Sequence, residues 1–82
     1  MKILIVDDHG VVREGLRKLF VAHFEAEVLE TSGIDDALEV YDRQRPNVVV
    51  LDLNLEGAGG LEVLRRILAA DSNARVVVFS MH

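Results

Sequence analysis

Three short runs of uninterrupted apolar residues stand out along the chain, at positions 3–6, 48–51 and 76–79. These runs are rich in β-branched residues and do not alternate with polar positions. Continuous apolar runs of this length are typical of strands that are buried on both faces, as in a parallel sheet. A fourth segment, 27–31, has a charged residue near each end and predicts an edge strand.

Apolar residues with helical spacing fill the segments between these runs. The first segment predicts a helix with one apolar face, formed by Val12, Leu16, Leu19 and Phe20. Gly15 lies within this helix, where it costs about 1 kcal/mol relative to alanine. A close approach to a neighbouring backbone would explain this glycine. The charged residues of the helix predict a solvated face with local ion pairs, at Arg13, Glu14, Arg17 and Lys18.

Two further helices are predicted in the same way. The second has its apolar positions at Ile34, Ala37, Leu38 and Tyr41. Ser32, followed three residues later by Asp35, resembles a capping box at its start, and Pro46 marks its end. The third begins near Gly60, ends before a turn cluster at 71–73, and has apolar residues at Leu61, Leu64 and Leu68, with Val63 and Ile67 beside them. We expect these apolar stripes to face the protein core.

The predicted elements alternate in the order β-α-β-α-β-α-β. This alternation indicates an α/β fold with right-handed crossovers, namely a doubly wound parallel sheet. The chain has 82 residues and therefore forms one domain at most. We see no internal repeat and no interdomain linker.

Composition excludes several classes of function. Nine Lys and Arg residues against fourteen Asp and Glu residues give a formal net charge of −5, which argues against binding of nucleic acid or an anionic membrane by this segment. The absence of cysteine rules out a disulfide scaffold and a thiolate metal site. The first apolar run is followed at once by Asp7 and Asp8, so it is too short for a signal peptide or a membrane span. We expect a soluble cytoplasmic domain.

Polar residues follow each of the three buried runs. Asp7 and Asp8 end the first, Asp52 ends the second and Ser80 ends the third. In open α/β sheets the carboxyl ends of the strands form the ligand-binding edge, so these four side chains should converge there. Each also has a structural interpretation, because an Asp often caps a helix or turn and a Ser is often a satisfied loop hydroxyl. The joint occurrence of these polar residues at the ends of three strands favours a ligand-binding site.

Three carboxylates at one edge repel one another unless a cation is present. An all-oxygen donor set favours a hard ion, and Mg²⁺ fits best. Such an ion, with the Ser80 hydroxyl nearby, would stabilise charge on a phosphoryl group, and Asp52 could accept that group covalently. His9, His23 and His82 are not spaced as a metal cluster. His23 is interpreted as a packing residue or a helix C-terminal cap.

The motifs at 5–9, 12–16, 51–54, 60–62 and 78–82 together resemble those of response-regulator receiver domains. They are similar in particular to the subfamily with a C-terminal LuxR-type helix-turn-helix. The resemblance covers the whole chain. It implies a flavodoxin-like, CheY-like fold with strand order 2-1-3-4, and a protein that is not an enzyme beyond its own phosphorylation and dephosphorylation.

The resemblance also implies roles for individual residues. Asp52 would accept a phosphoryl group from a sensor histidine kinase. Asp7 and Asp8 would hold Mg²⁺ together with Asp52 and the backbone carbonyl of Asn54. Ser80 would be the switch hydroxyl, while Asn54 and His82 would tune the rate of dephosphorylation. In the full-length protein the output would be DNA binding and transcription regulation.

Two departures from the family pattern affect these expectations. Glu56 stands where family members usually have proline. In addition, the family's fourth helix, fifth strand and fifth helix have no counterpart, so we interpret residues 1–82 as a partial receiver domain. The strand at 76–79 would then be an exposed edge. We expect it to pair with a second copy, as a homodimer or by segment exchange.

Three other functional classes fit the sequence less well. A receiver-like interaction module without phosphorylation is the main alternative, favoured by Glu56 and by the exposed strand. A phosphohydrolase is disfavoured because the residue two positions after Asp52 is Asn54, and not a second Asp that would serve as general acid and base. A nucleotide-binding domain is least favoured, since no glycine-rich phosphate loop follows the first strand.

Overall fold

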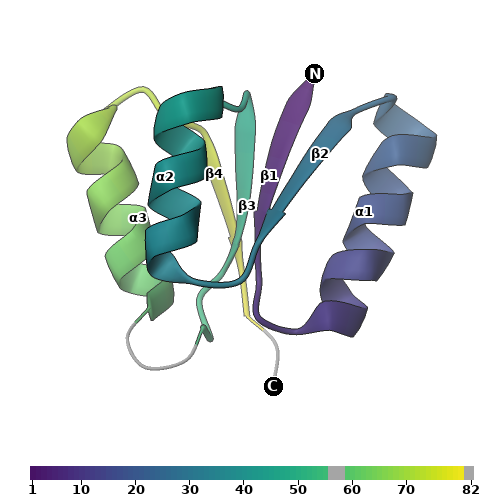
Figure 1. Ribbon diagram of the computed structural model, residues 1–82, viewed down its shortest axis with the longest axis horizontal. Helices are drawn as coiled ribbons and strands as arrows, with labels where there is room; N and C mark the ends of the chain where they lie inside the picture. Colours follow the sequence, from purple (N-terminus) through teal and green to yellow (C-terminus); the bar gives the residue numbers. More distant parts are fainter. Residues whose placement is uncertain (56–58, 81–82) are drawn as a thin grey trace.

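The computed structural model describes residues 1–55 and 59–80. Within these residues, four strands form one parallel sheet in the order β2-β1-β3-β4 (Figure 1). The predicted alternation, strand order and edge position of residues 27–31 are therefore confirmed. The elements in chain order are β1 Lys2–Val6, α1 Gly10–Phe24, β2 Glu27–Thr31, α2 Ile34–Gln44, β3 Val48–Asp52, α3 Gly59–Ala70 and β4 Val76–Phe79.

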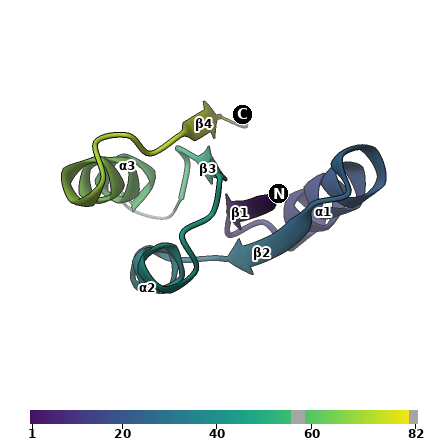
Figure 2. The ribbon, with the colours of Figure 1, turned by 90° about the horizontal axis from the view of Figure 1, so that it is seen from above.

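The helices cover the two faces of the sheet unequally. α1 lies on one face, and α2 and α3 lie together on the other (Figure 2). The core under α2 and α3 is the larger one. Its buried members are Leu4, Val6, Ala37, Tyr41, Val49, Leu51, Leu55, Val63 and Ile67. The core under α1 has only four buried members, namely Ile3, Ile5, Ala26 and Val50.

The apolar face predicted for α1 is only partly covered. No residue of α1 is fully buried, and the side chain of Leu19 is half exposed. Leu16 and Phe20 pack against the sheet. One helix cannot cover the width of four strands, so an apolar groove of about 430 Å³ is left beside α1, bounded also by β1, β3 and β4.

The buried face of α3 differs from the predicted stripe. Val63 and Ile67 are fully buried, whereas Leu61 is 58% and Leu68 is 41% exposed. The helix packs by its small N-terminal residues, Gly59 and Gly60, and by the positions one and two turns further on. Because this face of α3 packs against the core, Leu61 lies on the exposed side of the helix.

Glycine positions show why α3 packs in this way. A Cβ added at Gly60 would lie 2.5 Å from the Cα atom of Leu53 and 2.6 Å from the carbonyl oxygens of Asp52 and Leu53. The start of α3 therefore rests directly on the backbone that follows β3. A Cβ added at Gly15 would meet no atom within 4 Å, so a close approach to a neighbouring backbone does not explain Gly15.

The ends of α2 are partly as predicted. The helix ends at Gln44, and Arg45 and Pro46 follow it, as expected. The predicted capping box is wrong, because Gly33, not Ser32, is the N-cap residue and no side chain caps the helix. The predicted turn at 71–73 is confirmed by a hydrogen bond of 3.0 Å from the backbone N–H of Asn73 to Oδ1 of Asp71.

Tyr41 connects α2 to that turn. Its hydroxyl donates a hydrogen bond of 2.9 Å to Oδ2 of Asp71. This hydrogen bond is the main reason why the pKa of Asp71 lies below its usual value. Burial is the main reason why the pKa of Tyr41 lies above its usual value.

Candidate functional site: an acidic cluster at the carboxyl edge of the sheet

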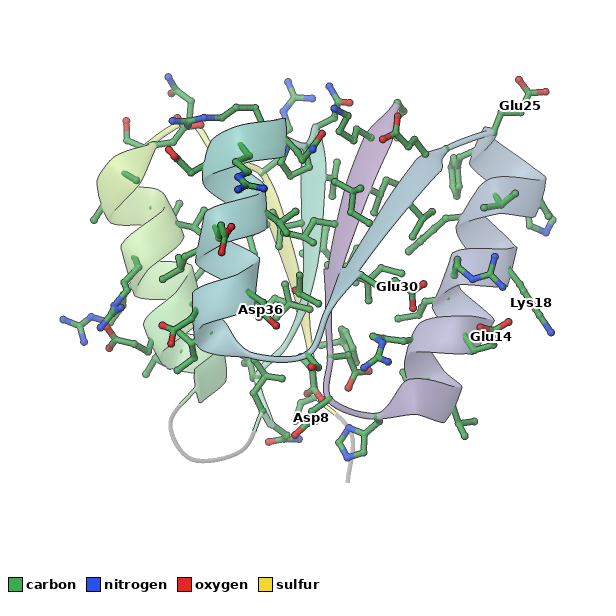
Figure 3. The ribbon with its side chains drawn as sticks, viewed as in Figure 1. Asp8, Glu14, Lys18, Glu25, Glu30 and Asp36 are labelled. Atoms are coloured by element: carbon green, nitrogen blue, oxygen red, sulfur yellow. The ribbon has the colours of Figure 1, made fainter. Side chains whose placement is uncertain are left out.

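The carboxyl ends of β1, β3 and β4 meet at one edge of the sheet, at the bottom of Figure 1. Asp7 follows β1, and Asp52 is the last residue of β3. One ligand atom from each of Asp7, Asp8, His9 and Asp52 lies within 4.8 Å of the others. Figure 3 shows Asp8 at this edge. The predicted convergence of the three carboxylates is therefore confirmed.

Asp7 and Asp52 are held in matching ways. Both side chains are 0% exposed. Oδ1 of Asp7 accepts a hydrogen bond of 2.8 Å from the backbone N–H of His9, and Oδ1 of Asp52 accepts one of 2.8 Å from that of Asn54. The second oxygen, Oδ2, is buried in both residues and accepts no hydrogen bond from any residue that the structure describes. Two desolvated, unsatisfied carboxylate oxygens in one cluster would be stabilised by a cation.

The alternative interpretation, in which Asp7, Asp8 and Asp52 only cap a helix or a turn, is only partly correct. Asp52 does stabilise the turn after β3 through its Oδ1 atom, as a capping residue would. The N-cap residue of α1 is His9, however, and no side chain caps that helix. Helix capping therefore does not explain the burial of Asp7. The acidic cluster could hold a metal ion, and its donor set of carboxylate oxygens fits a hard divalent cation.

His9 belongs to this cluster, which the sequence analysis did not foresee. Its Nδ1 atom lies 3.0 Å from Oδ1 of Asp7, 3.1 Å from Oδ1 of Asp8 and 3.4 Å from Oδ2 of Asp52. The hydrogen bond with Asp7 is the main cause of a raised His9 pKa; desolvation opposes it, and the charges of the three carboxylates add to it. The only signal in the sequence was its position next to Asp8. His23 lies exposed in the last turn of α1, where Glu25 is the C-cap residue.

Arg13 connects the acidic cluster to α1. Its Nη1 atom donates a hydrogen bond of 2.8 Å to the backbone carbonyl of Asp7, and its Nε atom lies 3.3 Å from Oε1 of Glu30 on β2. Arg17 pairs with Glu14 at 2.6 Å and with Glu30 at 3.8 Å. Figure 3 shows Glu30 between β2 and α1. The predicted ion pairs of this helix face are confirmed, and two of its arginines also reach the sheet.

Ser80 and Asn54 lie together at the rim of the cluster. Nδ2 of Asn54 donates a hydrogen bond of 2.9 Å to Oγ of Ser80. The end of β4 is therefore tied to the turn that carries Asp52. Glu56 and His82, which the sequence analysis also singled out, lie outside the described residues.

Comparison with known proteins identifies the family of this chain. The family model of the response regulator receiver domain matches residues 3–82, so the chain belongs to that family. Receiver domains are signalling modules and not classical enzymes. In the part of the chain that the structure describes, no helix is long and apolar enough to cross a membrane.

The individual relatives include response regulators of the NarL and LuxR type. The chain is 34% identical over 80 residues to the nitrate/nitrite response regulator protein NarL of Escherichia coli strain K12, covering 96% of this chain and 37% of that protein. It is 38% identical over 88 residues to the transcriptional activator protein ExaE of Pseudomonas putida, covering 100% and 39%. A LuxR-family two-component response regulator from Aurantimonas sp. SI85-9A1 has a similar crystal structure, with a TM-score of 0.90, 40% identity and coverage of 99% and 59%. The chain thus spans little more than a third of these curated relatives.

Proposed function

We propose that this chain is a phosphoacceptor receiver of a two-component system, in which Asp52 takes a phosphoryl group from a phosphohistidine of a sensor kinase. The observation that carries the proposal is the Oδ2 atom of Asp52. It is buried at the end of a central strand and lies in the acidic cluster with Asp7 and Asp8, and no hydrogen bond reaches it from residues 1–55 or 59–80. Membership of the receiver family supports the same role.

The phosphoryl transfer follows from this geometry. Oδ1 of Asp52 is held by the backbone N–H of Asn54, which leaves Oδ2 to attack the phosphorus atom. A P–O bond forms, the P–N bond to the donor imidazole breaks, and the imidazole leaves with its electron pair and takes up a proton. Asp7, Asp8, Asp52 and the backbone carbonyl of Asn54 would hold Mg²⁺, which supplies positive charge against the phosphoryl oxygens.

The remaining site residues would act after the transfer. Ser80 would donate its hydroxyl to a phosphoryl oxygen, and this would alter its hydrogen bond with Asn54 and the end of β4. Asn54 and His82 would set how fast water removes the phosphoryl group. The transcriptional activator among the relatives supports a transcription-regulating output in the full-length protein, which would act by binding DNA in the cytoplasm. The net charge of −5 supports a DNA contact made outside this segment.

Phosphorylation of the intact chain tests this proposal. Incubation with Mg²⁺ and acetyl phosphate is expected to add the mass of one phosphoryl group, as measured by intact-protein mass spectrometry. The adduct should disappear in Asp52→Asn and when EDTA removes the metal. Asp42→Asn is the matched control, because that side chain is an exposed carboxylate on α2. An adduct that persists in Asp52→Asn, or none in the wild-type chain, would contradict the proposal.

A second candidate function, an interaction module, is favoured by the uncovered side of the sheet. Among the described residues, β4 forms an edge of the sheet, and Val77 is 56% exposed. Val77 and Phe79 also line the apolar groove beside α1. A second copy would bring the same apolar patch and the same open strand edge, as a two-fold symmetric contact requires. We propose a homodimer through this face, formed by strand pairing or by segment exchange.

The molar mass of the chain in solution tests the proposed dimer. Light scattering is expected to show a concentration-dependent dimer for the wild-type chain and a monomer for Val77→Lys, because the lysine would bury its charge in the interface. Leu61→Lys is the matched control, since Leu61 is equally exposed at 58% but lies on α3, on the other face of the sheet. A wild-type chain that is monomeric at all concentrations would refute the dimer. Equal loss of dimer in Val77→Lys and Leu61→Lys would also refute it.

A further inference from the structure

We infer that His9 is a metal ligand of the acidic cluster, and that the cluster therefore binds a divalent transition metal such as Co²⁺ in preference to Mg²⁺. The inference rests on the proposed metal site of the receiver. It adds a nitrogen donor to a set of ligands that would otherwise consist of oxygen atoms only. The metal class changes with it, because imidazole suits transition metals and carboxylates alone suit Mg²⁺.

The distances around Nδ1 of His9 fit shared coordination. Neighbouring ligands of an octahedral ion, each about 2.1 Å from the metal, lie about 3.0 Å apart, and opposite ligands about 4.2 Å apart. Nδ1 of His9 is 3.0 Å from Oδ1 of Asp7 and 3.1 Å from Oδ1 of Asp8. One ligand atom from each of the four residues falls within a span of 4.8 Å. One ion can therefore contact all four with small adjustments.

The backbone holds the imidazole ring over the carboxylates. His9 is the N-cap residue of α1 and has an extended conformation, with φ −98° and ψ 104°. Its own N–H donates to Oδ1 of Asp7 at 2.8 Å, which fixes the start of the helix against the cluster. Arg13, one turn further on, holds the carbonyl of Asp7. The ring position thus follows from the loop that joins β1 to α1.

A ligand role accounts for the unsatisfied oxygens better than hydrogen bonding by His9 alone. Among the described residues, the buried Oδ2 atoms of Asp7 and Asp52 have no hydrogen-bond partner, although Nδ1 of His9 lies 3.4 Å from Oδ2 of Asp52. A single ring nitrogen cannot satisfy both of these Oδ2 atoms at once. A metal ion would contact both. The side chain of His9 is 53% exposed, so the cluster is open to solvent on that side.

Metal binding to the intact chain tests this inference with a spectroscopic measurement. Pulsed electron paramagnetic resonance of bound Mn²⁺ is expected to show coupling to an imidazole nitrogen in the wild-type chain. Bound Co²⁺ should give a visible absorption spectrum that changes when His9 is replaced. In His9→Ala and in the more polar His9→Gln, the nitrogen coupling should disappear. The ratio of Co²⁺ to Mg²⁺ affinity should fall about tenfold or more in both.

His23→Ala is the matched control, because His23 is an exposed histidine at the far end of the same helix. It should keep both the nitrogen coupling and the affinity ratio. Mn²⁺ binding without nitrogen coupling, or an unchanged affinity ratio in folded His9→Gln, would overturn the inference and leave the proposed receiver function intact. Failure of the wild-type chain to bind any of the three ions would instead refute the proposed metal site itself, and the inference with it.

Discussion

Gly60→Ala is expected to lower the free energy of unfolding by about 3 kcal/mol, because an added methyl group would overlap backbone atoms that have no room to move. The overlap involves the Cα atom of Leu53 at 2.5 Å and the carbonyl oxygens of Asp52 and Leu53 at 2.6 Å. These atoms belong to the end of β3 and to the turn after it. The same variant should therefore displace the carboxylate of Asp52 and slow its phosphorylation. Urea unfolding measures the first effect, and the rate of adduct formation measures the second.

Gly15→Ala provides the control for this prediction. Gly15 lies in the middle of α1, where an added Cβ would meet no atom within 4 Å. Alanine is favoured over glycine in a helix interior by about 1 kcal/mol. We therefore expect Gly15→Ala to be slightly more stable than the wild-type chain. Equal stability of Gly60→Ala and the wild-type chain would show that α3 does not rest on the turn after β3.

Ile67→Ala is expected to cost about 3 kcal/mol, because it leaves a cavity where α3 packs on the sheet. The Ile67 side chain is fully buried in the larger core, together with Val63 on the same helix face. Its replacement removes apolar contacts that the remaining side chains cannot fully replace. Chemical denaturation of the metal-free chain gives this difference without a contribution from metal binding.

Leu61→Ala separates the two faces of α3. Leu61 is 58% exposed on the same helix, and exposed substitutions of this kind usually change stability by less than about 0.5 kcal/mol. The sequence offered both faces, since Leu61, Leu64 and Leu68 are spaced as regularly as Val63 and Ile67. A larger loss for Leu61→Ala than for Ile67→Ala would mean that the helix is rotated about its axis relative to the structure described above.

The acidic cluster has a cost in stability that the proposed function would explain. Asp7 and Asp52 are fully buried carboxylates, and within the described part of the chain each keeps an oxygen without a hydrogen bond. Burial of this kind opposes folding when no cation is present. The same feature favours positive charge at this edge of the sheet, as the proposed metal site requires. The imidazole of His9 lies beside all three carboxylates.

The sequence by itself determined the sheet and the position of the acidic cluster. Strands buried on both faces require continuous apolar runs, and parallel strands place their carboxyl ends at one edge. Asp7, Asp8 and Asp52 were therefore expected at the same edge. Ser80 follows the same rule, since it comes directly after β4.

Only the tertiary structure decided the features that depend on contacts between distant segments. The ring of His9 lies over the carboxylates because the loop after β1 folds back on itself, which no spacing rule encodes. Gly60, and not Gly15, makes the close backbone approach, because that depends on how α3 meets the end of β3. The buried face of α3 follows from the same contact. Local periodicity identifies which residues can be apolar neighbours, but long-range packing selects which of them are buried.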